Sequence, residues 1–175
     1  KAELPENDCY YLEIRGANSS ADVFVIGEKL AHHDGGYSTW RVDITKHIKD
    51  ETLIEIDVDN SPNDRVYPQM ADFTFYGGIY RDVNLICVND AHFDLDYFGG
   101  NGLMITPAVE GKDAKVEVQT FTKNLKEGQS LVYTIYDAEE KELYKIETRE
   151  NRAEFEMKDV HLWHGRRDPY LYCCE

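Results

Sequence analysis

The sequence predicts an all-β chain made of two successive β-sandwiches. Apolar and polar residues alternate with period two in several short segments, and clusters of turn residues separate these segments. No segment carries the apolar spacing of a long amphipathic helix. Short strands joined by frequent turns are typical of sandwiches.

In the first half, the clearest expected strand is LIEIDVDN at 53–60. Its Ile54, Ile56 and Val58 would face one side and its acidic residues the other, because successive side chains of a strand point to opposite faces. The denser apolar segments at 22–27 and 83–88 also have strand composition. A short helical turn is expected within 43–51, DITKHIKDE.

In the second half, the segments 131–138 and 153–159 have strand composition, the latter with clear alternation. Turn residues such as EGKD at 110–113 separate the strands. We expect the domain boundary near residue 90, which gives a first domain at 1–90 and a second at 91–175. The second is about the size of one immunoglobulin-like sandwich.

The charge of the chain excludes some classes of partner. The formal net charge is −15, so nucleic acids and anionic membranes are not expected partners, because phosphate contacts need Lys and Arg. No apolar segment reaches the length of about 18 residues that spans a bilayer. No signal peptide is visible, although the chain does not begin with Met. The four cysteines form no CxxC pair and are expected to be reduced, which favours a cytoplasmic location.

Two histidine-containing segments are candidates for chemistry. His32 and His33 are adjacent, so in an extended segment they would point to opposite faces and would not readily share a metal ion. Trp163 and His164 have no neighbouring nucleophile, and we interpret their segment as a turn whose aromatic ring fills the space between strands.

The segment MADFTFYGGIYRDVNL at 70–85 is unusual in so acidic a chain. If 79–85 is one strand, Arg81 faces the apolar side and would be buried against a partner. Gly77 and Gly78 indicate a bulge or a close backbone approach. Asp72 lies in an aromatic-rich loop, where a carboxylate could hydrogen-bond sugar hydroxyls. No pair of catalytic carboxylates can be identified.

Three segments resemble glycoside hydrolase family 2. GANSSADVFVIGEKLAHHDGGYSTWRVDIT at 16–45 and DFTFYGGIYRDVNL at 72–85 are similar to motifs of that family's sugar-binding domain. LWHGRRDPYLY at 162–172 is similar to the end of its immunoglobulin-like second domain. Ile26 and Trp40 depart from the usual Asn and Phe. The matches occur in the family's order and span essentially the whole chain.

The resemblance implies a jelly-roll, galactose-binding-like sandwich, N-terminally incomplete, followed by an immunoglobulin-like sandwich. It also implies a catalytic (β/α)₈ barrel that this chain does not contain, so the chain alone is expected to be inactive. The chain would then be a non-catalytic N-terminal fragment of a retaining exo-β-glycosidase, with β-galactosidase as the leading expectation. β-Glucuronidase, β-mannosidase, a stand-alone carbohydrate-binding module and a scaffold of tandem sandwiches remain alternatives.

The resemblance further implies site residues and partners. Asp72 and Asn18 match positions that contact the sugar, and the Asp also ligates sodium in some β-galactosidases. Gly78, Ile79 and Arg81 match structural positions. No catalytic residue and no cofactor are expected in this chain, whereas sodium or magnesium is expected in the complete enzyme. The expected partners are a β-galactoside, the protein's own barrel and further copies in a homo-oligomer.

Overall fold

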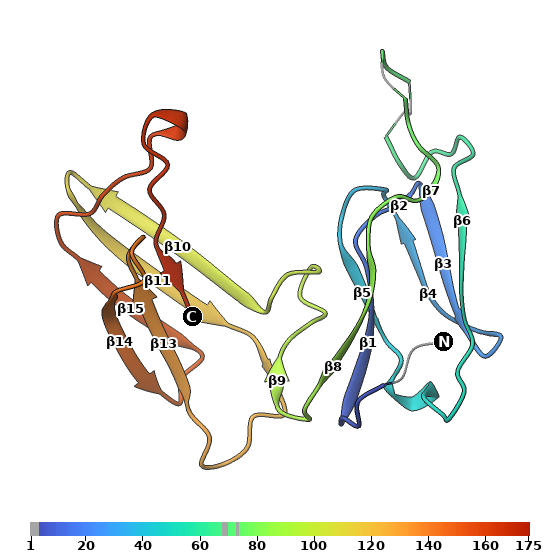
Figure 1. The fold of residues 1–175 in the computed structure, drawn as a ribbon, viewed down its shortest axis with the longest axis horizontal. Coiled ribbons are helices and arrows are strands. Elements are labelled where there is room, and N and C mark those ends of the chain that lie inside the picture. Colours follow the sequence, from blue (N-terminus) through green and yellow to red (C-terminus); the bar gives the residue numbers. More distant parts are fainter. Residues whose placement is uncertain (1–3, 68–69, 73) are drawn as a thin grey trace. The chain divides into compact units, whose positions relative to one another are not determined.

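The computed structural model describes residues 4–67, 70–72 and 74–175 (Figure 1). The chain divides into two compact units, Lys1–Asn101 and Gly102–Glu175, which we call the first and the second domain. Their main strand pairs are antiparallel, and the all-β prediction is confirmed. Within the described residues, no helix has the length and apolar character needed to cross a bilayer.

The first domain is a jelly-roll, galactose-binding-like sandwich with two three-stranded sheets, ordered β5–β1–β8 and β4–β3–β6. A two-stranded sheet pairs β2 with β7. The expected helical turn is present as the 3₁₀ helix η1. The elements are β1 (Cys9–Ile14), β2 (Ala17–Asn18), β3 (Ser20–Val25), β4 (Glu28–Asp34), β5 (Trp40–Asp43), η1 (Thr45–His47), β6 (Ile54–Asp59), β7 (Gly78–Ile79), β8 (Val83–Val88) and β9 (His92–Phe93).

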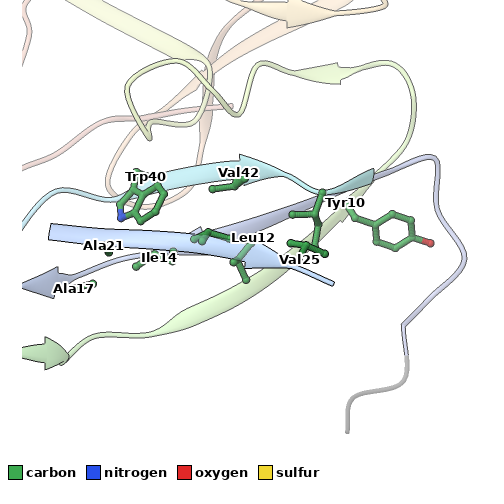
Figure 2. Packing of buried hydrophobic residues seen from close by; sticks show 10 residues of the cluster. Tyr10, Leu12, Ile14, Ala17, Ala21, Val25, Trp40 and Val42 are labelled. Atoms are coloured by element: carbon green, nitrogen blue, oxygen red, sulfur yellow. The ribbon is translucent and has the colours of Figure 1, made fainter. Parts of the chain in front are cut away.

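The core of the first domain is formed by alternate side chains of its strands. Leu12 and Ile14 of β1 and Val25 of β3 are almost completely buried. Figure 2 shows side chains of β1, β3 and β5 in this cluster, with the rings of Trp40 and Tyr10 at its opposite ends. Each fully buried aliphatic side chain contributes about 1.5–3 kcal/mol to stability, so this cluster is the main source of cohesion.

Strand β6 shows how the sequence pattern becomes structure. Its apolar residues Ile54, Ile56 and Val58 pack against the core, while the acidic residues between them are exposed. The predicted two-faced strand is therefore confirmed. The acidic character of this strand belongs to its solvated face and needs no ligand to explain it.

A buried ion pair lies on the other face of the central strand β1. Glu13 is only 4% exposed, and its register neighbours are Arg41 on β5 and Asn84 on β8. Arg41 Nη2 lies 2.7 Å from Glu13 Oε2, and Asn84 Nδ2 donates to Glu13 Oε1 at 3.0 Å. Arg15 Nε also donates to Glu13 Oε1, at 2.8 Å. The carboxylate is thus buried with several donors, as a buried charge requires.

Arg41 also contacts the segment that follows β9. Its Nη1 donates to the carbonyls of Leu95 at 3.0 Å and Gly100 at 2.5 Å. A Cβ added at Gly99 would collide with the carbonyl of Thr39, so the backbone passes close to the start of β5. Residues 91–101 belong to the first of the two compact units, whereas the domain boundary expected near residue 90 assigns them to the second domain.

The second domain is an immunoglobulin-like sandwich with sheets ordered β10–β11–β15 and β14–β13–β16. Its core contains Val116 and Val118 of β11, Tyr133 of β13 and Phe155 of β15. The buried hydroxyls of Thr120 and Tyr133 lie 2.8 Å apart and share a hydrogen bond. The elements are β10 (Leu103–Glu110), β11 (Asp113–Thr120), β12 (Thr122–Lys123), β13 (Leu131–Tyr136), β14 (Glu142–Thr148), β15 (Arg152–Met157), the 3₁₀ helix η2 (Gly165–Arg167) and β16 (Cys173–Cys174).

Candidate functional site

Most of the residues that the sequence analysis selected lie in, or contact, three loops of the first domain. These loops are residues 35–39 between β4 and β5, 60–77 between β6 and β7, and 80–82 between β7 and β8. The long β6–β7 connection extends beyond the ends of the sheets, and β2 and β7 lie at its base (Figure 1). We call these three loops together the loop cluster.

Asn18 joins two parts of the loop cluster. Its side chain is 3% exposed, and its Nδ2 donates to the carbonyl of Tyr76 at 2.9 Å. A Cβ added at Gly36 would collide with the Asn18 side chain, so only glycine allows this approach. Asn18 therefore connects the β4–β5 loop at Gly36 to the β6–β7 loop at Tyr76. That Asn18 also contacts a sugar stays a prediction.

Asp72 lies in the loop that Asn18 anchors. It is exposed and sits in a bend of the β6–β7 connection, four residues before Tyr76. Phe73, which follows it, lies outside the described residues. An exposed carboxylate on an anchored loop is available to a polar ligand, which fits the substrate-binding role predicted for Asp72.

A network of charged groups holds Arg65, which lies in the first part of the β6–β7 loop. Arg65 Nε donates to Asp34 Oδ2 at 3.0 Å, and Ser20 Oγ donates to Asp34 Oδ1 at 2.5 Å. His32 lies between Asp34 and Asp22, with its Nε2 3.1 Å from the first carboxylate and its Nδ1 2.5 Å from the second. The hydrogen bond from Ser20, with further bonds from His32 and Arg65, lowers the pKa of Asp34 to about 2 despite partial burial. Asp34 thus stays ionised and holds Arg65.

Three tyrosines meet in the loop cluster, and the sequence analysis did not identify them as a group. The rings of Tyr37 and Tyr67 are stacked with 6.0 Å between centroids and 10° between planes. Tyr80 meets Tyr37 edge-on, also at 6.0 Å. They come from three different loops, and no spacing in the sequence indicates that such loops converge.

The structure corrects the prediction for Arg81. The expected strand over 79–85 is divided into β7 and β8, and Arg81 lies exposed between them rather than buried on an apolar face. Its Nη1 donates to the carbonyl of Tyr37 at 2.8 Å. The strand is interrupted because Arg81 and its neighbours turn toward the β4–β5 loop. The close approach predicted at Gly77 is confirmed, since a Cβ there would collide with the side chain of Asn60.

The histidine and tryptophan segments lie in different surroundings. His33 stacks on Trp40 with centroids 4.9 Å apart, whereas His32 contacts carboxylates, so the two rings have different partners as expected. No group of three or more His, Cys, Asp or Glu side chains in the described part of the chain could hold a metal ion. Trp163 is 62% exposed, so the prediction that its ring fills a space between strands is wrong. The ring lies beside η2, with its nearest atom 3.7 Å from where a Cβ on Gly165 would be.

The chain is similar to known glycosidases. Residues 1–79 match a family model described as glycosyl hydrolase 2 galactose-binding domain-like. A β-glucuronidase of Bacteroides fragilis is 29% identical over 93% of this chain, and a β-galactosidase of Thermoanaerobacter pseudethanolicus is 31% identical over 93%. The crystal structure of an FMN-binding β-glucuronidase from Facaelibacterium prausnitzii L2-6 has a TM-score of 0.86 and 36% identity over 98% of this chain.

This chain spans 25% and 22% of the two curated relatives and 27% of the chain in that crystal structure. The fold and the comparisons give the class: a pair of β-sandwich domains similar to those of glycosidases. The chain belongs to glycoside hydrolase family 2, and its described residues contain no catalytic barrel.

Proposed function

We propose that the complete protein is a retaining exo-β-glycosidase that removes terminal β-galactosyl groups, and that this chain supplies part of its substrate pocket. The observation that carries the proposal is the anchored loop cluster, in which Asn18 and Gly36 hold the loop that presents Asp72. The similarity to a β-galactosidase, at 31% identity, supports the choice of sugar.

The chemistry divides between this chain and the barrel that the family resemblance implies. Retaining hydrolysis needs two carboxyl groups about 5–5.5 Å apart, one as nucleophile and one as acid and base. This chain would orient the sugar: the Asp72 carboxylate accepts hydrogen bonds from hydroxyl groups, which fixes the position of the ring relative to the catalytic pair. Asp72 could also supply one oxygen ligand to a sodium ion.

β-Glucuronides are the second candidate substrate. The β-glucuronidases from Bacteroides fragilis and Facaelibacterium prausnitzii support this alternative, at 29% and 36% identity. The test is to express the complete reading frame and to compare nitrophenyl β-galactoside with nitrophenyl β-glucuronide. We expect the galactoside to have the higher kcat/KM. A higher value for the glucuronide would replace the proposed substrate, and hydrolysis of neither would overturn the proposed activity.

The 175-residue chain by itself should have no glycosidase activity. It can position a sugar but lacks the pair of carboxyl groups that stabilises an oxocarbenium-like transition state. The purified chain should therefore release no nitrophenol from either substrate above a buffer control. Hydrolysis that disappears when a residue of this chain is substituted would contradict the prediction.

A further inference from the structure

The three tyrosines of the loop cluster are partly exposed on this chain, so part of the apolar surface of each ring does not contribute to the stability of the fold. Tyr37 is 42% exposed, Tyr67 53% and Tyr80 36%. An aromatic ring that remains in water forgoes the stabilisation that burial would give it. Tyr37 contacts both of the other rings, so the three rings form one aromatic surface.

The backbone and side chains around the rings are held in place. The Tyr80 hydroxyl donates to the carbonyl of Gly36, immediately before Tyr37. Arg81 donates to the carbonyl of Tyr37, and its guanidinium lies over the Tyr80 ring, 5.3 Å from the centroid. The Arg65–Asp34 ion pair holds the segment that leads to Tyr67. A surface fixed in this way loses little conformational entropy when it binds a ligand.

The chemistry of this surface fits a pyranose ring. One face of a pyranose presents C–H groups, which pack on aromatic rings, and its edge presents hydroxyls, which bond to phenols and carboxylates. The tyrosines and Asp72 belong to the same loop cluster: Tyr67 precedes Asp72 by five residues in one loop. On this chain the rings are partly exposed, so a sugar stacked on them is covered on one face only, which suits a leaving-group sugar next to the terminal one.

We propose that Tyr37, Tyr67 and Tyr80 form a platform that stacks on the leaving-group sugar of a β-linked disaccharide. This inference rests on the proposed glycosidase function, and it assigns to the platform the sugar next to the terminal one that Asp72 contacts. Tyr67 is the residue to test, because it is the most exposed of the three and its side-chain hydrogen bond is to another tyrosine of the platform, Tyr37, and not to the backbone of the loop cluster.

The test uses the complete protein and two substrates, lactose and methyl β-galactoside. Tyr67→Ala should lower kcat/KM for lactose about three- to tenfold, the range expected for one lost ring contact, and should leave the value for methyl β-galactoside unchanged. Tyr67→Phe keeps the ring and loses only the hydroxyl, so it should retain most of the value for lactose and all of the value for methyl β-galactoside. Phe98→Ala removes a 91% exposed ring elsewhere in the first domain and should change neither. Equal losses for both substrates in Tyr67→Ala, or no loss for lactose, would overturn the platform.

A binding measurement separates failure of the platform from failure of the glycosidase. Should the complete protein hydrolyse neither substrate, wild type, Tyr67→Ala and Tyr67→Phe are compared by saturation-transfer NMR with lactose. If saturation transfer to lactose is lost only in Tyr67→Ala, the platform is supported and only the proposed enzymatic activity is refuted. Equal transfer in all three proteins, or none in the wild type, would overturn the platform as well. Thermal melts of each variant confirm that it is folded.

Discussion

Arg41→Met should lower the free energy of unfolding of the first domain by about 3–5 kcal/mol, the cost of leaving one partner of a buried ion pair without the other. Glu13 and Arg41 side chains are each 5% exposed, so solvent compensates the remaining carboxylate little. Glu13 keeps its hydrogen bonds from Arg15 and Asn84, so the upper end of this range applies only if these donors shift. The substitution also removes the donors to the carbonyls of Leu95 and Gly100. Urea unfolding followed by tryptophan fluorescence measures the change, because Trp40 lies in the core of this domain.

The matched control is Arg152→Met in the second domain. Arg152 pairs with Glu117 and Glu154, but its side chain is 53% exposed. Exposed pairs contribute about 0–1 kcal/mol, so this variant should unfold almost like the wild type. A second check is the double variant Glu13→Leu/Arg41→Met, which should recover part of the loss because no unpaired charge remains. Equal effects of Arg41→Met and Arg152→Met would show that burial of the pair is unimportant.

The same ion pair predicts how stability depends on pH. Burial raises the pKa of Glu13, but hydrogen bonds from Arg15, Asn84 and Arg41 lower it more, from 4.5 to about 2. Because the pKa of Glu13 is lower in the folded state, the ionised carboxylate stabilises the fold above pH 4.5. This stabilisation is lost as the pH falls toward 2 and the carboxylate is protonated. Glu13→Gln should therefore be less stable than wild type at pH 7, and the difference should shrink between pH 4.5 and 2. A difference that stays constant over this range would contradict the shift.

Asp72→Asn should reduce kcat/KM of the complete enzyme about ten- to a hundredfold without unfolding the first domain. A hydrogen bond to a charged acceptor contributes roughly 1.5–3 kcal/mol, and a loss in substrate binding and transition-state stabilisation appears directly in kcat/KM. The exposed position of Asp72 in the loop cluster gives no reason for a large effect on stability. The measurement pairs steady-state kinetics with thermal melts of the same preparations.

Asp82→Asn is the control for Asp72→Asn. Asp82 is also exposed and belongs to the same sequence motif, but its partner is Arg15, at 3.6 Å, on the scaffold. It should retain nearly wild-type kinetics. If a sodium ion binds through Asp72, the loss in Asp72→Asn should also depend on sodium concentration. Early melting of Asp72→Asn with unchanged kinetics in the folded fraction would show that Asp72 is structural.

The candidate site could be predicted only in part from the sequence. Asp72 was selected because of its neighbours in the chain and its place in a family motif, and the structure presents it in an exposed loop. Asn18 was selected by its motif alone. Its hydrogen bond to the carbonyl of Tyr76 joins residues 58 positions apart in the chain, and the sequence gives no geometric information about residues so far apart. Arg81 was misplaced because a regular strand was assumed where the backbone turns between β7 and β8.

The sequence by itself determined the all-β fold class, the two faces of strands such as β6, and the family. Alternation is a local property: the two faces of β6 follow from its own six residues, because side chains of a strand point alternately to its two sides. Only the tertiary structure decided which polar groups meet. Glu13, Arg41 and Asn84 become neighbours through the register of three strands, and the tyrosine platform exists because three loops end at one edge of a sandwich. Such contacts depend on how sheets pair and where chains turn, which no single segment encodes.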